Sequence, residues 1–171
     1  MKLIQRARKN CISNGFTLME LLIVIAIILI LMLMAIPTIG SLKKKANHTS
    51  AIQSLRAITQ AELQYESSYP TSGFACTLAS LGGDPSTGAP SPASAQMLPQ
   101  ELAGGVKSGY LFTISNCTKV TVNNTDRITG YQINAVPETV GKTGDMGYCE
   151  DQFGTLKQDP TGGTNCTQVV Q

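Results

Sequence analysis

The feature that most constrains this chain is an unbroken run of apolar residues close to its amino terminus. Every residue from Leu21 to Ile36 is apolar, and the mainly apolar residues 16–19 lie just before the run, separated from it by Glu20. A span of about 20 such residues is long enough to cross a bilayer as an α-helix. An ionisable group inside such a segment costs roughly 2.5 kcal/mol or more, so Glu20 is expected to have a function that offsets this cost.

A short signature surrounds the start of the apolar run. A basic leader is followed by Gly15, by Phe16-Thr17-Leu18, by one further residue, by Glu20 and then by the apolar segment. This order resembles the processing site of type IV pilins and their relatives, the pseudopilins. The resemblance covers about the first quarter of the chain. It implies that a prepilin peptidase cuts between Gly15 and Phe16 and methylates the new amino terminus.

The same resemblance implies roles for individual residues and for partners. Phe16 would carry the methylated amine, Glu20 matches the acidic residue of the family, and Pro37 matches a proline found partway along the same helix. We therefore expect all three residues to act in assembly. The implied partners are identical subunits in a homopolymer, the prepilin peptidase that is also the N-methyltransferase, an inner-membrane assembly platform with other pilins, and membrane lipid before assembly.

The leader predicts how the segment is oriented in the membrane. Residues 1–15 are basic and contain no acid, which favours a cytoplasmic amino terminus. Lys43-Lys44-Lys45 opposes this asymmetry, and the longer leader outweighs it. A secretory signal peptide has a shorter apolar core and a small-residue cleavage site. We expect a single-pass inner-membrane precursor and then an extracellular pilus or a periplasmic pseudopilus, with an uncleaved anchor as the alternative.

The net charge argues against nucleic acid as a direct partner. The whole chain has 13 basic and 11 acidic residues, a formal charge of +2. Removal of the leader takes away Lys2, Arg6, Arg8 and Lys9 and leaves 9 basic and 11 acidic residues, a charge of −2. A mildly acidic protein lacks the basic stripe that binds phosphates.

The cysteines indicate an oxidising compartment. Cys11 leaves with the leader, and the four that remain in a small exported domain are typical of two disulfides. Four cysteines allow three pairings, and their spacings are not those of a zinc site. We favour Cys149 with Cys166, which closes a short terminal loop, and Cys76 with Cys117, and the sequence leaves the other pairings open.

A helix is expected to continue well beyond the apolar run. Apolar residues recur at spacings near three and four, and the helix is expected to end before Tyr69-Pro70. Pro37 removes a backbone donor and Gly40 adds flexibility, which predicts a bend there. A helix over residues 16–67 would measure about 75 Å, too long for a small domain to cover, so its first half has to lie in lipid or against other helices. The apolar positions are Ile39, Leu42, Ala46, Ile52, Leu55, Ile58 and Leu63.

Turn-forming residues dominate the segment that follows this helix. Residues 71–108 are rich in Gly, Pro, Ser, Ala and Thr, and residues 82–94 consist almost entirely of turn formers. This composition predicts a long surface loop, with short structured pieces at 76–81 and 96–102. In pilins the connection between helix and sheet is a variable surface region, so the resemblance implies that this loop belongs to the outer face.

Short strands are expected from residue 109 onward. Runs of β-branched and aromatic residues alternate with turn formers and predict an antiparallel sheet of about four strands. Tyr131, Ile133 and Ala135 alternate with Gln132 and Asn134, which leaves one face for the helix to cover. The expected strands are residues 110–115, 128–136, 146–150 and 155–157, and residues 159–171 have no pattern.

Together these patterns predict an α+β fold. A long amino-terminal helix with a transmembrane first half packs on a small antiparallel sheet, and disulfides staple the carboxyl-terminal region. The expected segments are the leader 1–15, the transmembrane or filament-core helix 16–37, the amphipathic half of that helix 38–67, the surface loop 68–108, and the sheet with the disulfide-bounded region 109–171.

The sequence predicts neither a catalytic site nor a cofactor or metal site. The single histidine, His48, lies on the polar side of the helix without a nearby triad partner, and it is expected to be solvated. Asp145, Glu150 and Asp151 cluster near one hairpin and could supply ligands to calcium. Solvated turn acids are the preferred interpretation of this cluster.

The expected function is therefore structural: a pilin that forms a type IV pilus. Major pseudopilins of type II secretion resemble this amino terminus but carry an Asp-Pro-Trp-Gly element and a calcium-binding loop. This chain has no tryptophan and has a cysteine-stapled end, which favours the pilus subunit over the pseudopilin alternative. The alternative from another class is a membrane-anchored binding domain that never polymerises. The sequence does not decide whether the chain is a major or a minor pilin, or whether the pilus serves motility, adhesion or DNA uptake.

Overall fold

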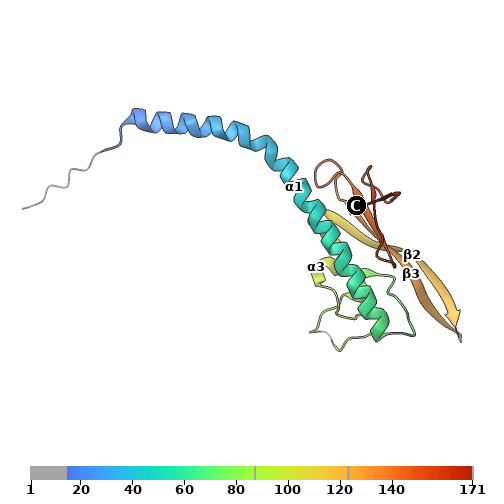
Figure 1. Cartoon of the computed structure of the whole chain (residues 1–171). Helices are drawn as coiled ribbons and strands as arrows, with labels where there is room; N and C mark the ends of the chain where they lie inside the picture. The colour runs from blue at the N-terminus through green and yellow to red at the C-terminus, as the bar shows by residue number, and fades with distance from the viewer. Residues whose placement is uncertain (1–14, 87, 123, 171) are drawn as a thin grey trace, which may run out of the picture. The chain divides into compact units, whose positions relative to one another are not determined.

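A computed structural model describes residues 15–86, 88–122 and 124–170, and the side chains of residues 34–38 and 122 lie outside this description. The chain divides into two compact units, Met1–Ile39 (unit 1) and Gly40–Gln171 (unit 2). Helix α1, Leu18–Ser68, begins in the first and ends in the second (Figure 1). The helix stops directly before Tyr69-Pro70, as predicted, because the residue before a proline is disfavoured in the α conformation.

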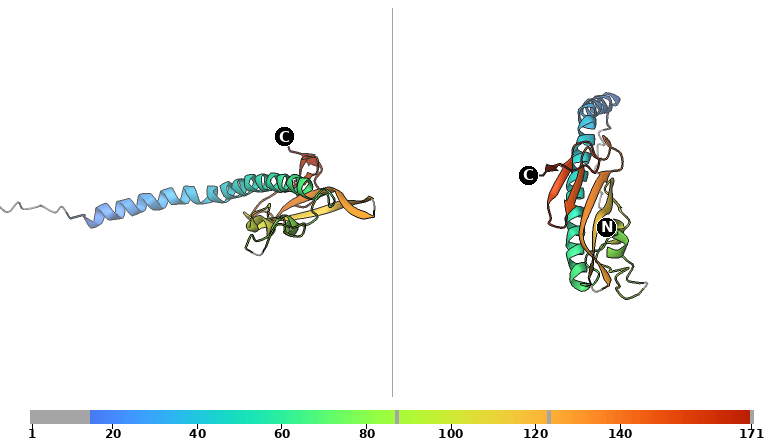
Figure 2. Two further views of the ribbon diagram at one scale, coloured as in Figure 1. Left: turned by 90° about the horizontal axis from the view of Figure 1, so that it is seen from below. Right: turned by 90° about the vertical axis from the view of Figure 1, so that its right-hand side faces the viewer.

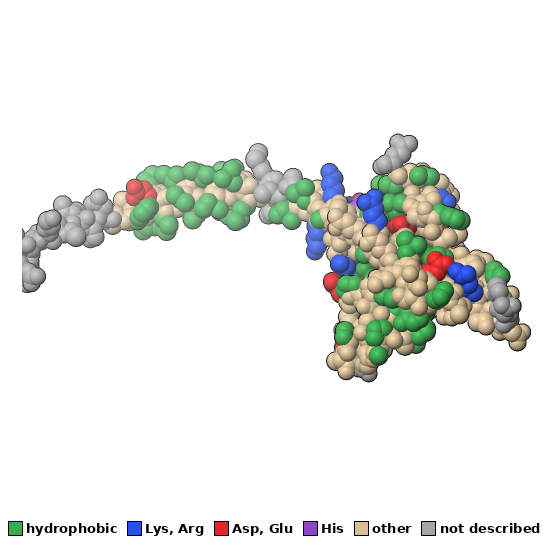
Figure 3. Space-filling view, turned by 60° about the horizontal axis from the view of Figure 1, so that its bottom comes forward, with side chains coloured by type: hydrophobic (Ala, Val, Ile, Leu, Met, Phe, Trp, Pro, Cys, Tyr) green, Lys and Arg blue, Asp and Glu red, His purple; other side chains and the backbone are tan. Residues whose placement is uncertain are grey.

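Unit 1, as far as it is described, consists of the first part of α1 and the residues just before it. Its large apolar side chains are all exposed, from 45 % at Ile28 to 85 % at Leu18. Figure 3 shows these side chains on every visible side of the helix. Among the described residues, no helix combines the length and the apolar character that crossing a membrane requires.

Unit 2 contains one antiparallel sheet with the second part of α1 along one of its faces (Figures 1 and 2). Six strands follow one another in the order of the sequence, so the prediction of about four strands was too low. Two of the six, β1 and β6, are two residues long and cannot show a two-residue period. The strands are β1 (Val106–Lys107), β2 (Tyr110–Val122), β3 (Thr125–Pro137), β4 (Gly147–Asp151), β5 (Leu156–Asp159) and β6 (Gln168–Val169).

Helix α1 presents one stripe of residues to the core of unit 2. Successive members of the stripe are four, three, four and three residues apart, which is the period of an α-helix. The stripe predicted from apolar residues alone was wrong in part, since Ile39, Leu42, Ala46 and Leu63 are exposed. Near the end of the helix Glu62 occupies the core position and the neighbouring Leu63 is exposed, while the other exposed positions precede Ala51, the first buried residue of α1 in unit 2. The stripe consists of Ala51, Leu55, Ile58, Glu62 and Tyr65, and Ser54 and Ala61 are buried beside it.

The sheet contributes the other side of the core. Tyr131, Ile133 and Ala135 on β3 are all buried, which confirms the predicted face. On β2, Phe112 is buried opposite the small Ala135, so a large side chain lies beside a small one. Full burial of a large apolar side chain stabilises a fold by about 1.5 to 3 kcal/mol, so this face is a main source of stability.

The segment between α1 and the sheet is more than a surface loop. It contains two short helices, α2 (Leu78–Leu81) and α3 (Gln100–Ala103), within or beside the two stretches where structure was expected. Several of its apolar residues are buried in the core, which corrects the surface-loop prediction. Their spacing follows neither a helix nor a strand period, so no periodic pattern marks them. They are Leu78, Leu81, Ala95, Leu98 and Leu102.

Two disulfides staple unit 2. Cys76 is joined to Cys117 with their Cα atoms 6.1 Å apart, and Cys149 is joined to Cys166 with their Cα atoms 6.0 Å apart. These are the two pairs favoured from the sequence. Cys117 lies where the β2–β3 register is irregular, beside Asn116 with φ +52°. Asparagine tolerates this left-handed conformation, so the irregularity sits where the backbone can accept it.

Candidate functional site

The residues predicted for processing and assembly lie at the start of α1. Gly15 and Phe16 precede the helix, and Glu20 is the acidic residue of its first turn. Phe16 is 83 % exposed, so its side chain has little support from its own chain. Pro37 is on the same helix, and its side chain lies outside the description, while the bend expected there stays a prediction.

Thr17 and Glu20 form a capping box. The Thr17 N–H and the Thr17 hydroxyl both donate to Oε2 of Glu20, at 2.9 and 2.8 Å, and the Glu20 N–H donates to the Thr17 hydroxyl at 3.2 Å. Such reciprocal bonds satisfy backbone donors that a helix start leaves open. Thr17 was not among the residues predicted from the sequence, although the spacing Thr-x-x-Glu is the known signal of this motif. Glu20 therefore has a local structural role whatever else it does.

Gly15 is not required by the fold of this chain. A Cβ atom placed on Gly15 would meet nothing within 4 Å, and its backbone does not have the positive φ that favours glycine. A glycine that its own fold does not need is consistent with recognition by another protein. A Cβ atom placed on Gly40, within α1, would also meet nothing within 4 Å, so Gly40 offers a matched comparison.

The buried carboxyl of Glu62 is the most perturbed acid of unit 2. Its Oε2 accepts a hydrogen bond from the Ala75 N–H at 2.7 Å, and Oε1 has no hydrogen-bond partner among the described residues. Burial raises the pKa of Glu62 to about 8, and the Ala75 N–H lowers it in part. Loss of solvation favours the neutral form, so Glu62 is protonated in the folded chain near neutral pH.

The three carboxylates near the β4 hairpin are engaged within the chain. Asp145 pairs with Lys44 at 2.9 Å, and Oδ1 of Asp151 accepts two backbone N–H groups of its own turn. Glu150 is buried, which corrects its interpretation as a solvated acid, and it accepts a hydrogen bond from Thr59 at 3.0 Å. Burial raises the pKa of Glu150, against the smaller lowering by Thr59. Over the described part of the chain, no three His, Cys, Asp or Glu side chains lie where they could hold a metal ion.

His48 packs between two tyrosines and is not a freely solvated residue as predicted. Its ring meets Tyr110 and Tyr148 edge to face, with ring centres 6.0 and 5.9 Å away. Its Nε2 accepts the Asp145 N–H at 3.1 Å, which requires an unprotonated Nε2. Burial lowers the pKa of His48, while the Asp145 carboxylate acts in the opposite direction. His48 thus positions the segment before β4.

Comparison with known proteins concerns the amino-terminal part. Residues 12–36 match the prokaryotic N-terminal methylation motif. The chain therefore carries the class III leader signal of type IV pilins and pseudopilins, and the matched range contains Gly15, Phe16 and Glu20. This motif supports a pilin-like or pseudopilin precursor, a structural class of protein. Comparisons with curated proteins and with solved structures gave no significant match.

Proposed function

We propose that this chain is the precursor of a structural subunit of a type IV pilus. A prepilin peptidase cuts it between Gly15 and Phe16 and methylates the Phe16 amine. The segment 16–37 holds the subunit in the inner membrane, with the leader in the cytoplasm, until an assembly platform moves it into a filament of identical subunits. The match of residues 12–36 to the prokaryotic N-terminal methylation motif is the observation that carries this proposal.

The exposed apolar surface of unit 1 supports an assembly role. Each large apolar side chain of α1 from Leu18 to Leu33 is at least 45 % exposed. A contiguous apolar surface of this kind requires lipid or protein to cover it. Lipid covers it in the precursor, and the helices of neighbouring subunits cover it in the filament.

The carboxylate of Glu20 provides a means of setting the register between subunits. Cleavage creates a charged amine at Phe16, and both groups lose water when the helix enters a filament core. A buried charge without a partner costs several kcal/mol, and a well-placed opposite charge offsets that cost. The capping box is worth about 1 kcal/mol, so a bond between Glu20 and a neighbour's amine outweighs it. Each added subunit is then stable only where the two groups meet.

A pilus is favoured over a secretion pseudopilus by the carboxyl-terminal region. The chain has no tryptophan, and Cys149–Cys166 closes a terminal loop, features that set it apart from the major pseudopilins considered above. Purified surface filaments in which this chain is the dominant subunit are expected. Absence of the chain from such filaments, together with failed substrate secretion in a deletion strain, would establish the pseudopilin instead.

Processing is tested with two matched glycine variants. Gly15→Leu and Gly40→Leu each add a side chain where a Cβ meets no neighbour, so neither is expected to disturb the fold. We expect Gly15→Leu to leave only full-length chain in a host with a prepilin peptidase, while Gly40→Leu is cleaved. Mass spectrometry of the cleaved product should find N-methylated Phe16 as its first residue. Normal filaments built from uncleaved chains would contradict the proposal.

A further inference from the structure

Three consecutive lysines surround α1 at the beginning of unit 2. Successive residues of an α-helix are about 100° apart, so Lys43, Lys44 and Lys45 point in three directions around its axis. Lys43 and Lys45 are exposed, while Lys44 is half-buried and pairs with Asp145. Figure 3 shows basic side chains on more than one side of the helix at this level.

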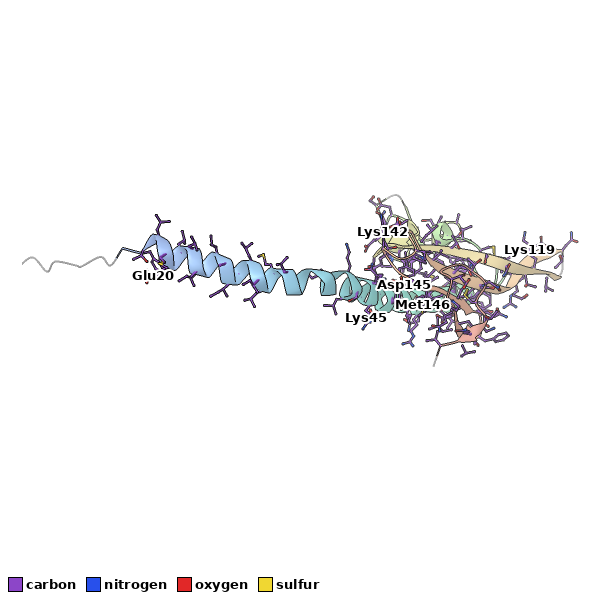
Figure 4. The ribbon with its side chains drawn as sticks, turned by 90° about the horizontal axis from the view of Figure 1, so that it is seen from above. Glu20, Lys45, Lys119, Lys142, Asp145 and Met146 are labelled. Carbon is purple, nitrogen blue, oxygen red and sulfur yellow. A yellow bond between two sulfur atoms is a disulfide. The ribbon has the colours of Figure 1, made fainter. Side chains whose placement is uncertain are left out.

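The segment 139–145, between β3 and β4, brings a further lysine to the same level. Three contacts hold this segment on α1: Asn47 Nδ2 donates to the Thr143 carbonyl at 2.7 Å, the Asp145 N–H donates to His48, and Lys44 pairs with the Asp145 carboxylate. Lys142 lies within the held segment and is exposed. In Figure 4, Lys45 and Lys142 lie at the same end of unit 2, and Lys119 lies at the opposite end.

We call Lys43, Lys45 and Lys142 the lysine ring. Asp145, the acid that touches α1 here, is neutralised by Lys44. The nearest strand ends add one charge of each sign, Lys107 at the end of β1 and Glu138 after β3. The ring therefore keeps a positive charge of about three.

The position of the ring along the helix corresponds to a membrane surface. Lys43 follows Ile36, the last residue of the apolar run, by seven residues, which is about 10 Å along a helix. The headgroup layers of both leaflets together add roughly 10 to 15 Å to a hydrocarbon core of ~30 Å, so each leaflet contributes half of this thickness. A lysine side chain can extend several ångströms from the helix back toward the phosphates. Ammonium groups at this distance lie at the level of the lipid phosphates when segment 16–37 spans the bilayer.

We propose that the lysine ring binds the phosphate groups of anionic phospholipids on the side of the membrane where unit 2 folds. This inference rests on the proposed membrane-held precursor. The arrangement around the helix favours lipid over a protein partner, because a plane of headgroups meets the helix on all sides at one level. A protein docked on a helix instead meets one face, at spacings of three and four residues. The same ring gives a reason for the lysines that follow the apolar run, which otherwise oppose the charge asymmetry set by the basic leader.

The test measures the lipid selectivity of the full chain. The chain in uncharged detergent micelles is titrated with fluorescently labelled phosphatidylglycerol and, separately, with labelled phosphatidylcholine. We expect tighter binding of phosphatidylglycerol, weakened by added salt. Lys45→Gln should reduce this preference about fivefold, and Lys43→Gln/Lys45→Gln/Lys142→Gln should reduce it on the order of a hundredfold. Lys119→Gln, which removes one exposed lysine at the opposite end, is the matched control and should leave the preference unchanged.

Several results would overturn the inference. Equal binding of both lipids, or an equal loss in Lys119→Gln, would show that the ring has no special role. Competition by inorganic phosphate at the lipid's own concentration would indicate a site for free phosphate. Lost self-association with unchanged lipid preference in the triple variant would indicate an acidic surface of a second copy. Cleavage after Gly15 and filament yield, measured separately, report on the proposed function and not on the ring.

Discussion

The protonated carboxyl of Glu62 makes the stability of unit 2 fall as the pH rises. The pKa of Glu62 is 4.5 without perturbation and about 8 in the folded chain, so between these values the folded chain keeps a proton that the unfolded chain has released. The stabilisation is therefore fully present below pH 4.5 and is lost as the pH rises through 8. At 1.36 kcal/mol per pH unit, the free energy of unfolding is expected to fall by about 3 kcal/mol up to pH 7 and by roughly 5 kcal/mol in total.

The substitution Glu62→Gln removes this dependence with little change in shape. Glutamine keeps an oxygen that accepts the Ala75 N–H and has no proton to release. We expect the variant to match the parent near pH 5 and to exceed its free energy of unfolding by several kcal/mol at pH 9. Glu150, whose pKa is also raised, contributes in the same direction in both proteins and cancels in the difference.

The measurement is urea unfolding of the full chain in uncharged detergent at pH 5, 7 and 9, followed by circular dichroism. Glu66→Gln is the matched control, because Glu66 lies one helical turn further along α1, partly exposed and paired with Arg127. This control should keep the slope of the parent. Parallel loss of stability in the parent and in Glu62→Gln would show that Glu62 is ionised in the core, and the reasoning from burial would then be wrong.

Two further predictions concern assembly and the staples. Glu20→Ala and Thr17→Ala both remove the capping box, at a cost of about 1 kcal/mol. Only Glu20→Ala should abolish incorporation of cleaved subunits into filaments. Filament yield, normalised to the amount of cleaved protein, distinguishes the two variants. Equal filament yields from the two variants would show that Glu20 acts only as a helix cap and has no separate role in assembly. Cys149→Ser should destabilise unit 2 by ~2 to 5 kcal/mol and lower subunit yield, and the intact parent should weigh four hydrogens less than its reduced form because of its two disulfides. Free thiols at Cys149 and Cys166 in exported protein would contradict this second prediction.

The sequence predicted those parts of the fold in which one physical rule acts alone. The end of α1 at Ser68 follows from the proline two residues later, and the buried face of β3 follows from strict alternation. The methylation motif was recognisable because its residues are contiguous. The capping box could have been found by the same reasoning, since Thr17 and Glu20 are three residues apart.

Other features depend on contacts between residues distant in the sequence. Glu62 occupies a core position because Ala75 supplies a donor from another segment, and an apolar pattern cannot indicate a buried acid. The placement of His48 likewise depends on Tyr110, Tyr148 and the Asp145 N–H. Strands β1 and β6 exist only because a longer neighbour is present to pair with them.

The order of the sheet has a consequence for how the domain is made. Each strand from β2 to β6 pairs with the strand before it in the sequence, so every ladder joins two consecutive strands. Pairing between consecutive strands gives a lower contact order than pairing between distant strands, which favours faster folding. If the chain is held at its amino-terminal helix and crosses the membrane in sequence order, as the proposed function requires, it can therefore add one strand at a time as it emerges. Cys166 follows β5 and precedes β6, so the Cys149–Cys166 disulfide can close only after the chain through β5 has emerged.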